Sequence, residues 1–306
     1  MGAAGTGRNP LETVATLVRL PNLFTAPPDV VLGAALVAAA GNAVPAGPVA
    51  GLAVASVLLY AAGTTLNDYF DAAEDARERP ERPIPSGDVS RRGALALGLA
   101  LLVAGPAVAL LVAGAVAGAV AGAVGLAVLL YDGLFKGSAV GFLFMGSARG
   151  LNVLLGTTVA GVGPLALPPW ATGVPVVVLL YIAAVTYMAE GETGRGSRRA
   201  VSTAVGGVTV AAAGVLGLLA VRSPSPLETA LVAVLLVGFL AWTGRPLRAA
   251  YADPVPARVG PAVGACVLGL VVLDAAFAAT VGPAWGLAAL AFLVPAVGLS
   301  RVFDVT

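Results

Sequence analysis

The sequence contains no histidine, one cysteine and one lysine, and only 11% of its 306 residues are charged. Without an imidazole, histidine-based catalytic triads, histidine-ligated zinc sites and histidine proton shuttles are excluded. The single thiol, Cys266, excludes an intrachain disulfide and a cysteine-based metal cluster. Any chemistry must therefore use carboxylates, cationic side chains, hydroxyls and amides.

Apolar residues are abundant, at 58% of the chain, and the mean hydropathy is +0.95. They occur in runs of about 20 residues, the length of a helix that crosses a bilayer. Aromatic residues make up only 6%, which argues against a β-barrel with aromatic girdles. The sequence therefore predicts an all-α fold in one domain over residues 1–306, a polytopic membrane bundle of nine to ten transmembrane helices. The expected spans lie at roughly 22–41, 47–66, 92–112, 114–131, 138–162, 172–190, 199–221, 227–243, 259–280 and 284–301.

Basic residues are distributed unequally between the two sides of the predicted membrane. Of the seventeen, Arg149 falls within a span, Arg222 alone falls on the outer side, and the other fifteen fall on the inner side if the N-terminus is cytoplasmic. This positive-inside pattern predicts a multi-pass protein of the cell membrane with its N-terminus and its larger polar loops in the cytoplasm. The net charge of only +1 gives no support for a nucleic-acid partner.

Twelve of the 33 charged side chains crowd into one segment, TTLNDYFDAAEDARERPERPIPSGDVSRRG, residues 64–93. Asn67, Asp71 and Asp75 are spaced by four, so they share a face if the preceding span continues as a helix, and Asp68 flanks them. A bound cation would relieve the repulsion among these carboxylates, and Mg²⁺ takes one or two carboxylates together with phosphate oxygens. The alternative is a solvated loop whose acids pair with its own arginines.

The prolines that follow this acidic stretch are expected to end the helix. The next span then begins after a turn, with Ser90 as its N-cap. The positive-inside rule alone explains Arg91 and Arg92, as anchors at the cytoplasmic surface.

The segment NDYFDAAED matches the NDxxDxxxD pattern of the UbiA superfamily of intramembrane prenyltransferases, and RPERPIPSG resembles the Arg-Pro-rich continuation found there. The resemblance implies a helical bundle around a central cavity open to the cytoplasmic side, with two acid-rich loops at its mouth. It also implies that Mg²⁺ holds the diphosphate of an isoprenoid donor, while the donor's tail lies in a groove that is open to membrane lipid. The prenyl group would then pass to a small-molecule or lipid acceptor of unknown identity.

Carried over residue by residue, the resemblance assigns Asp68, Asp71 and Asp75 to the metal and Asn67 to the diphosphate. Lys136, in YDGLFKGSAVG, resembles a Tyr-xxxx-Lys element whose lysine contacts the diphosphate; an interfacial anchor is the alternative. Asn22, in RLPNLFT, resembles a polar position at the start of the family's first span, expected to face the diphosphate; a helix cap is the alternative.

The second acidic loop, YMAEGETGRGSRRA, departs from the family's aspartate-rich pattern. Its Glu190 and Glu192 are expected to bind metal only if the chain is irregular there, because on a regular helix they would point about 200° apart. The neighbouring glycines allow that irregularity. Arg195 and Arg198 are candidate diphosphate contacts, with positive-inside anchoring as the alternative.

Arg149 and Asn152 lie three residues apart within a predicted span, in MGSARGLNVLLG. An intramembrane arginine is costly and usually faces a cavity or a partner, so Arg149 is expected to pair with Glu190 or with the diphosphate. Together with Lys136, these two residues are the expected catalytic side chains. The RGLN element and the EGET…GSRR loop together resemble a divergent, EboC-like branch of the superfamily. Asp274, near the outer end of its span, is interpreted as an interfacial acid.

Three functions remain open: a Mg²⁺-dependent prenyltransferase, a UbiA-type terpene cyclase in which the donor's own double bonds capture the cation, and a non-catalytic lipid-binding or transport component. An intact acidic motif argues against the last. A cyclase requires an aromatic-lined chamber, and few aromatic residues are expected near the cavity, so transfer is favoured. Those aromatic residues are Phe70, Phe135, Phe142, Phe144, Tyr181 and Tyr187.

Overall fold

The structure, a computed structural model, describes residues 9–161, 163, 167–192 and 196–303. In these ranges every regular element is helical, and nine helices are long and apolar enough to cross a membrane, which confirms the predicted fold class. The α-helices are α1 (Pro10–Leu17), α2 (Leu20–Leu23), α3 (Pro27–Ala39), α4 (Ala46–Glu78), α5 (Arg91–Ala113), α6 (Ala115–Leu130), α7 (Ala139–Gly156), α8 (Pro169–Ala189), α9 (Arg198–Arg222), α10 (Pro226–Ala252), α11 (Pro256–Ala279), α12 (Pro283–Leu290) and α13 (Leu293–Leu299). Two short helices complete the set, η1 (Tyr131–Phe135) and η2 (Thr157–Ala160).

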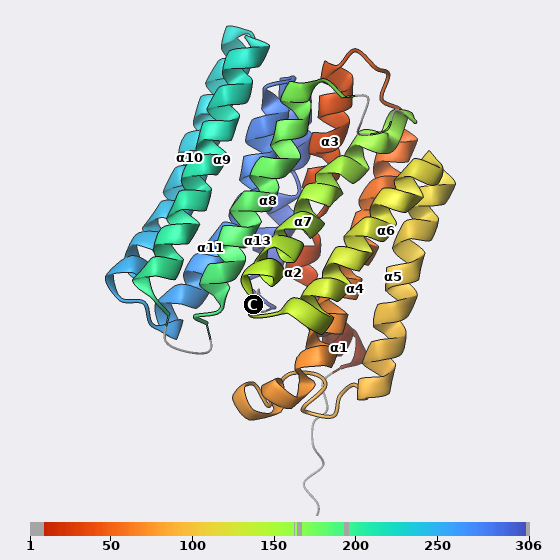
Figure 1. Cartoon of the computed structure of the whole chain (residues 1–306), viewed down its shortest axis with the longest axis vertical. Coiled ribbons are helices and arrows are strands. Elements are labelled where there is room, and N and C mark those ends of the chain that lie inside the picture. Colours follow the sequence, from red (N-terminus) through yellow and green to blue (C-terminus); the bar gives the residue numbers. More distant parts are fainter. Residues whose placement is uncertain (1–8, 162, 164–166, 193–195, 304–306) are drawn as a thin grey trace, which may run out of the picture.

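The long helices stand side by side in one bundle (Figure 1). Helices α4, α5 and α6 form one flank, the α9–α10 hairpin forms the opposite flank, and α7 and α8 lie between them. Helices α3 and α11 are buried along most of their length and form the centre of the bundle. The centre of the bundle is therefore built from one helix near the N-terminus and one helix near the C-terminus.

The predicted tenth span, residues 284–301, is wrong. It forms α12 and α13, two helices of 8 and 7 residues, and neither is long enough to cross the membrane. Pro295 lies in the first turn of α13, where it lacks the N–H that a continuous helix would donate to Ala291. The proline thus removes one hydrogen bond at the break, although α5, α8, α10 and α11 each continue through an internal proline.

Helices α3 and α7 approach closely because each has a glycine at their contact. A Cβ added to Gly33 would lie 2.1 Å from the carbonyl oxygen of Val153, and one added to Gly156 would lie 2.3 Å from that of Val30. Small residues commonly allow such backbone contacts between membrane helices. This contact fixes α7, and with it Arg149 and Asn152, against the buried α3.

Gly33→Ala is expected to lower the free energy of unfolding by about 1–3 kcal/mol, because a backbone carbonyl cannot move aside as a flexible side chain can. The measurement is unfolding of the purified protein in mixed micelles by increasing SDS. Gly122→Ala is the matched control, because a Cβ there meets nothing within 4 Å. Equal stability of the two variants would contradict the proposed tight contact.

Candidate active site

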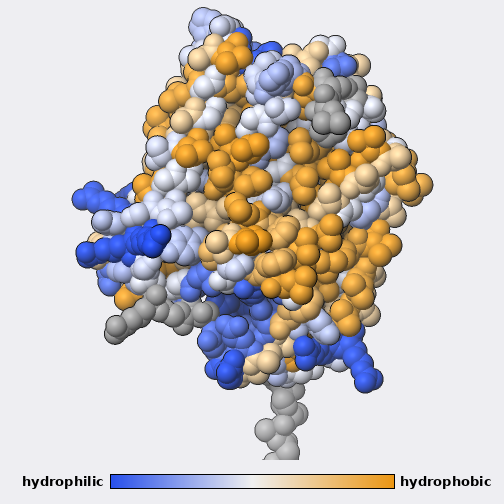
Figure 2. Space-filling view, in the orientation of Figure 1, coloured by the Kyte–Doolittle hydropathy of each residue, from blue (hydrophilic) through white to orange (hydrophobic). Residues whose placement is uncertain are grey.

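A cavity of about 350 Å³ opens at the end of the bundle where α4 ends. Figure 2 shows hydrophilic side chains gathered at this end, below a broad hydrophobic band. The cavity walls come from α2, α4, α6, α7, α8 and α11, with acidic and basic residues at the mouth and smaller polar side chains deeper in. Its volume lies within the range of small-molecule binding sites.

Helix α4 carries the first acidic motif out of the membrane. With 33 residues it is about 50 Å long, whereas the hydrocarbon core is about 30 Å thick. Asn67, Asp71 and Asp75 all line the cavity, which confirms the predicted shared face. The helix ends at Glu78, just before the first proline, and Ser90 caps the next helix by accepting a hydrogen bond from Gly93, both as predicted.

Two arginines bind the acids of α4. Nη1 of Arg82 lies 3.2 Å from Asp68 and 3.0 Å from Asp75. Nη2 of Arg19 donates to Asn67 and Asp68, both at 3.2 Å. Asp68 is buried beneath these arginines and does not itself line the cavity, so the acids that can meet a ligand directly are its neighbours on α4.

Lys136 crosses the cavity mouth to form an ion pair with Asp71. It follows η1, a π-helical turn that ends α6 and also carries Asp132. Asp132 accepts a 2.8 Å hydrogen bond from Nδ2 of Asn67, so this turn is tied to α4 at two points. Asp132 was not predicted as a site residue, although it is an acid at the end of an apolar run.

The second acidic segment faces the first. Glu190 and Glu192 lie in the turn that ends α8, and both line the cavity. Arg79, which follows α4, lies 3.8 Å from Glu192, and Lys136 acts electrostatically on Glu190. The expected irregular backbone is present, because a Cβ on Gly191 would lie 2.7 Å from Cα of Gly196. Oε1 of Glu192 is buried without a hydrogen-bond partner among the described residues.

Burial raises the pKa of both glutamates. For Glu190, Lys136 opposes this rise, whereas the nearby acids Glu74 and Asp71 add to it. For Glu192, three arginines, with Arg79 first, oppose the rise. A bound cation would therefore stabilise the ionised form of both side chains.

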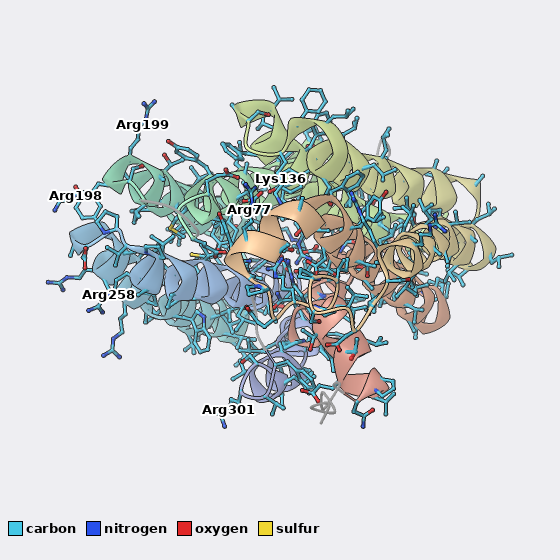
Figure 3. The ribbon with its side chains drawn as sticks, turned by 90° about the horizontal axis from the view of Figure 1, so that it is seen from below. Arg77, Lys136, Arg198, Arg199, Arg258 and Arg301 are labelled. Atoms are coloured by element: carbon cyan, nitrogen blue, oxygen red, sulfur yellow. The ribbon has the colours of Figure 1, made fainter. Side chains whose placement is uncertain are left out.

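The other predicted contacts of this loop lie elsewhere. Arg195 lies outside the described residues. Arg198 is exposed and is not among the residues that line the cavity. Figure 3 shows it pointing outward at the far end of the molecule, whereas Lys136 and Arg77 lie near the middle.

A second polar cluster lies deep in the bundle. Arg149 forms an ion pair with Asp29, with Nε 3.2 Å from Oδ2, and not with Glu190 as expected. Asn152 donates to the same carboxylate at 2.8 Å and to the carbonyl of Ala26 at 2.9 Å. Arg149, Asn152 and Asn22 all line the cavity.

Asp274 belongs to this deep cluster, so its interpretation as an interfacial acid is wrong. Its side chain is 0% exposed and its carboxyl group contacts that of Asp29. Position along the span placed it near the outer surface, but α11 lies in the centre of the bundle, where packing hides it. Asp29 was not predicted as a site residue, although an acid within a membrane span is by itself a candidate.

Aromatic side chains line little of the cavity. Tyr60 and Tyr131 are the aromatic residues among its described lining, and the six suggested by the sequence are not there. Tyr181, one of the six, is fully buried and donates to the carbonyl of Cys266. The walls therefore do not resemble an aromatic chamber.

The mouth is suited to a divalent cation by its chemistry. The described lining residues include seven acids and five bases, an excess of two negative charges when all are ionised. No group of three or more acids in the described part of the chain is placed to hold one metal ion unaided. Mg²⁺ requires only one or two carboxylates when phosphate supplies further oxygens, so the donor set fits that ion together with a phosphorylated ligand.

Fold and site together define a multi-pass helical membrane protein with an acid-lined cavity at one membrane surface. A model of the UbiA prenyltransferase family matches residues 30–196, more than half of the chain. The chain belongs to the UbiA prenyltransferase family.

Curated relatives support this membership. The chain is 35% identical to digeranylgeranylglyceryl phosphate synthase of Haloquadratum walsbyi over 162 residues, 50% of this chain and 53% of that protein. It is 58% identical to the synthase of Methanoregula boonei over 52 residues, 17% of this chain and 19% of that protein. The matches thus span about a fifth to a half of the relatives' length. They do not test the resemblance to an EboC-like branch.

Solved structures share the fold. A UbiA homologue from Aeropyrum pernix K1 has a TM-score of 0.64 at 19% identity, covering 83% of this chain and 96% of that chain. A UbiA homologue from Archaeoglobus fulgidus bound to GPP and Mg²⁺ has a TM-score of 0.64 at 14% identity, covering 91% and 99%. At these identities the likeness extends to the fold alone.

Proposed function

We propose that this protein is a Mg²⁺-dependent intramembrane prenyltransferase that ionises an isoprenoid diphosphate at the cavity mouth and transfers its prenyl group to an acceptor. The observation that carries the proposal is the meeting of two acidic segments, from α4 and from the end of α8, across one cavity that continues into the membrane. The N-terminus and this mouth are proposed to face the cytoplasm, on the strength of the positive-inside pattern.

The charge balance supports a cation between protein and substrate. A diphosphate is strongly anionic, and the described lining already carries more acids than bases. The donor would therefore be repelled unless divalent cations accompany it. Asp71 and Asp75 on α4 and Glu190 and Glu192 opposite them would hold Mg²⁺, with Asp68 fixing the arginines behind them. When bound, Mg²⁺ would neutralise the departing diphosphate as a Lewis acid.

The basic side chains have complementary roles. Lys136 is held at the mouth by Asp71 and is placed to donate to a diphosphate oxygen. The side-chain amide of Asn67 is oriented by Arg19 and Asp132 and also lines the cavity. Loss of diphosphate would break the C–O bond, and the electron pair would leave with the diphosphate. The resulting allylic cation would be captured by an acceptor oxygen, whose proton would pass to the released diphosphate. Arg149, Asn152 and Asn22 remain proposed substrate contacts deeper in the cavity.

The acceptor is proposed to be a lipid that enters from the membrane. The relatives' names, digeranylgeranylglyceryl phosphate synthases, favour a glycerol phosphate ether lipid and a geranylgeranyl donor. The small number of aromatic residues along the described cavity walls favours transfer over cyclisation.

Purified protein incubated with geranylgeranyl diphosphate, Mg²⁺ and geranylgeranylglyceryl phosphate is expected to release diphosphate and form a lipid with two prenyl chains. Chelation by EDTA should stop the reaction. Geranyl and farnesyl diphosphates without acceptor form the control arm: a cyclic hydrocarbon released there would replace the transferase proposal with a cyclase. Failure to bind any of the three donors in the presence of Mg²⁺ would overturn both.

A further inference from the structure

A second charged region lies away from the cavity, at the ends of the helices on the opposite flank. Five exposed arginines, and one acid, Asp253, occur there. Among the described residues none of these arginines forms an ion pair. The five are Arg198, Arg199, Arg245, Arg248 and Arg258. Figure 3 shows Arg198, Arg199 and Arg258 directed outward, away from Lys136. The positive charge here is therefore available to an external anion.

An apolar groove of about 540 Å³ runs between α9 and α10 to this region. Val205 and Val208 of α9 and Leu240 of α10 are among its walls, and Arg248 and Tyr251 lie at its charged end. The guanidinium of Arg198 lies 5.8 Å from the ring centre of Tyr251, and its Nη2 donates to the carbonyl of Ala252 at 3.3 Å. Two arginines and a phenol are thus gathered where the groove ends.

We propose that this groove binds an anionic phospholipid, with an acyl chain along the apolar walls and the phosphate at Arg248 and Arg198. Arg248 lies four residues before the end of α10, about 6 Å along the helix, so its aliphatic stem covers the groove while its charge reaches the headgroup level. The site is independent of the prenyl diphosphate cavity and does not depend on the proposed function.

A second copy of this chain is a poorer occupant, because a symmetric dimer across this groove would bring the five arginines of each copy together. Free phosphate could meet the arginines but not the apolar walls. The combination of a long apolar wall with unpaired positive charge at one end therefore favours a membrane lipid with a negative headgroup.

Native mass spectrometry of the purified full-length protein tests this proposal. With phosphatidylglycerol and phosphatidylcholine of identical chains, the anionic lipid is expected to bind about 25-fold more tightly, about five-fold for each arginine. Arg198→Gln combined with Arg248→Gln should remove that preference, whereas Arg92→Gln, an exposed arginine on α5, should keep it. Equal binding of both lipids to the unaltered protein, or a preference that survives the double change, would overturn the proposal.

The apolar half of the site is tested without changing any charge. A side chain added at Gly244, which lines the groove, meets nothing within 4 Å, so Gly244→Phe would fill the groove and is expected to reduce phosphatidylglycerol binding at least ten-fold. Gly238→Phe on the same helix is the control, because Gly238 also has open space but does not line the groove. Equal effects of the two changes, or a dimer lost in Gly244→Phe, would each count against the lipid site.

Discussion

Asp71→Asn is expected to reduce Mg²⁺-dependent turnover of geranylgeranyl diphosphate by roughly 10²–10³-fold, the size of effect seen when one group that stabilises transition-state charge is removed. Asp71 lies on the cavity face of α4 and binds Lys136 across the mouth. The substitution therefore removes a carboxylate proposed to hold Mg²⁺ and frees a lysine beside the diphosphate. Turnover should fall, and the Mg²⁺ concentration needed for half-maximal rate should rise.

The measurement is diphosphate release as a function of Mg²⁺ concentration, with membrane insertion and thermal stability recorded for each variant. Glu81→Gln is the matched control, because Glu81 is an exposed acid close to the same motif but is not among the cavity-lining residues. Asp75→Asn should behave like Asp71→Asn, since Asp75 also lines the cavity and holds Arg82. Normal turnover in both variants would contradict a metal site at α4.

The arrangement of α4 could be predicted because it depends on local regularities. A helical period of about four residues places Asn67, Asp71 and Asp75 on one face in any context, and the prolines that follow act on the backbone wherever they occur. The number of membrane-crossing helices was also readable, apart from the last apolar segment, which forms two short helices. Local signals thus predicted the elements and one wall of the site.

The partners of the charged residues could not be predicted, because they are set by packing between distant segments. Arg149 binds Asp29, which is 120 residues away in the sequence, and the contact exists because Gly33 and Gly156 bring α3 and α7 together. The same applies to Arg198, whose position in an Arg-rich loop gave no indication that α9 turns it outward. An acid within an apolar span, such as Asp29, nevertheless indicates a buried side chain that has a partner inside the bundle.

The deep cluster contains a buried ion pair. Asp29 and Asp274 are both 0% exposed, and one guanidinium faces them. Arg149 forms an ion pair with Asp29, and Asn152 donates a hydrogen bond to the same carboxylate. Removing either member of the ion pair therefore leaves a buried charge without its counter-ion.

Asp29→Leu is accordingly expected to lower the free energy of unfolding by about 3–5 kcal/mol, the typical cost of leaving one partner of a buried ion pair alone. Asp29→Leu combined with Arg149→Met should recover most of that loss, because replacing a buried pair by apolar side chains is often neutral. Recovery should be incomplete, since Asp274 loses its contact with Asp29. SDS-induced unfolding in mixed micelles measures the stability of both variants and of the unaltered protein, with Asp253→Asn, an exposed acid, as the control. A double variant as unstable as Asp29→Leu would show that the ion pair does not account for the loss.

The same double variant separates the structural role of Arg149 from a catalytic one. Arg149 both pairs with Asp29 and lines the cavity, so a single Arg149 substitution would lower turnover in either case. If Arg149 serves only to neutralise Asp29, turnover of geranylgeranyl diphosphate should return together with stability. We expect stability to return while turnover stays at least ten-fold low, because a guanidinium facing the cavity contributes a charge-assisted contact that methionine cannot replace. Recovery of both would instead assign Arg149 to the scaffold and leave catalysis to the residues at the mouth.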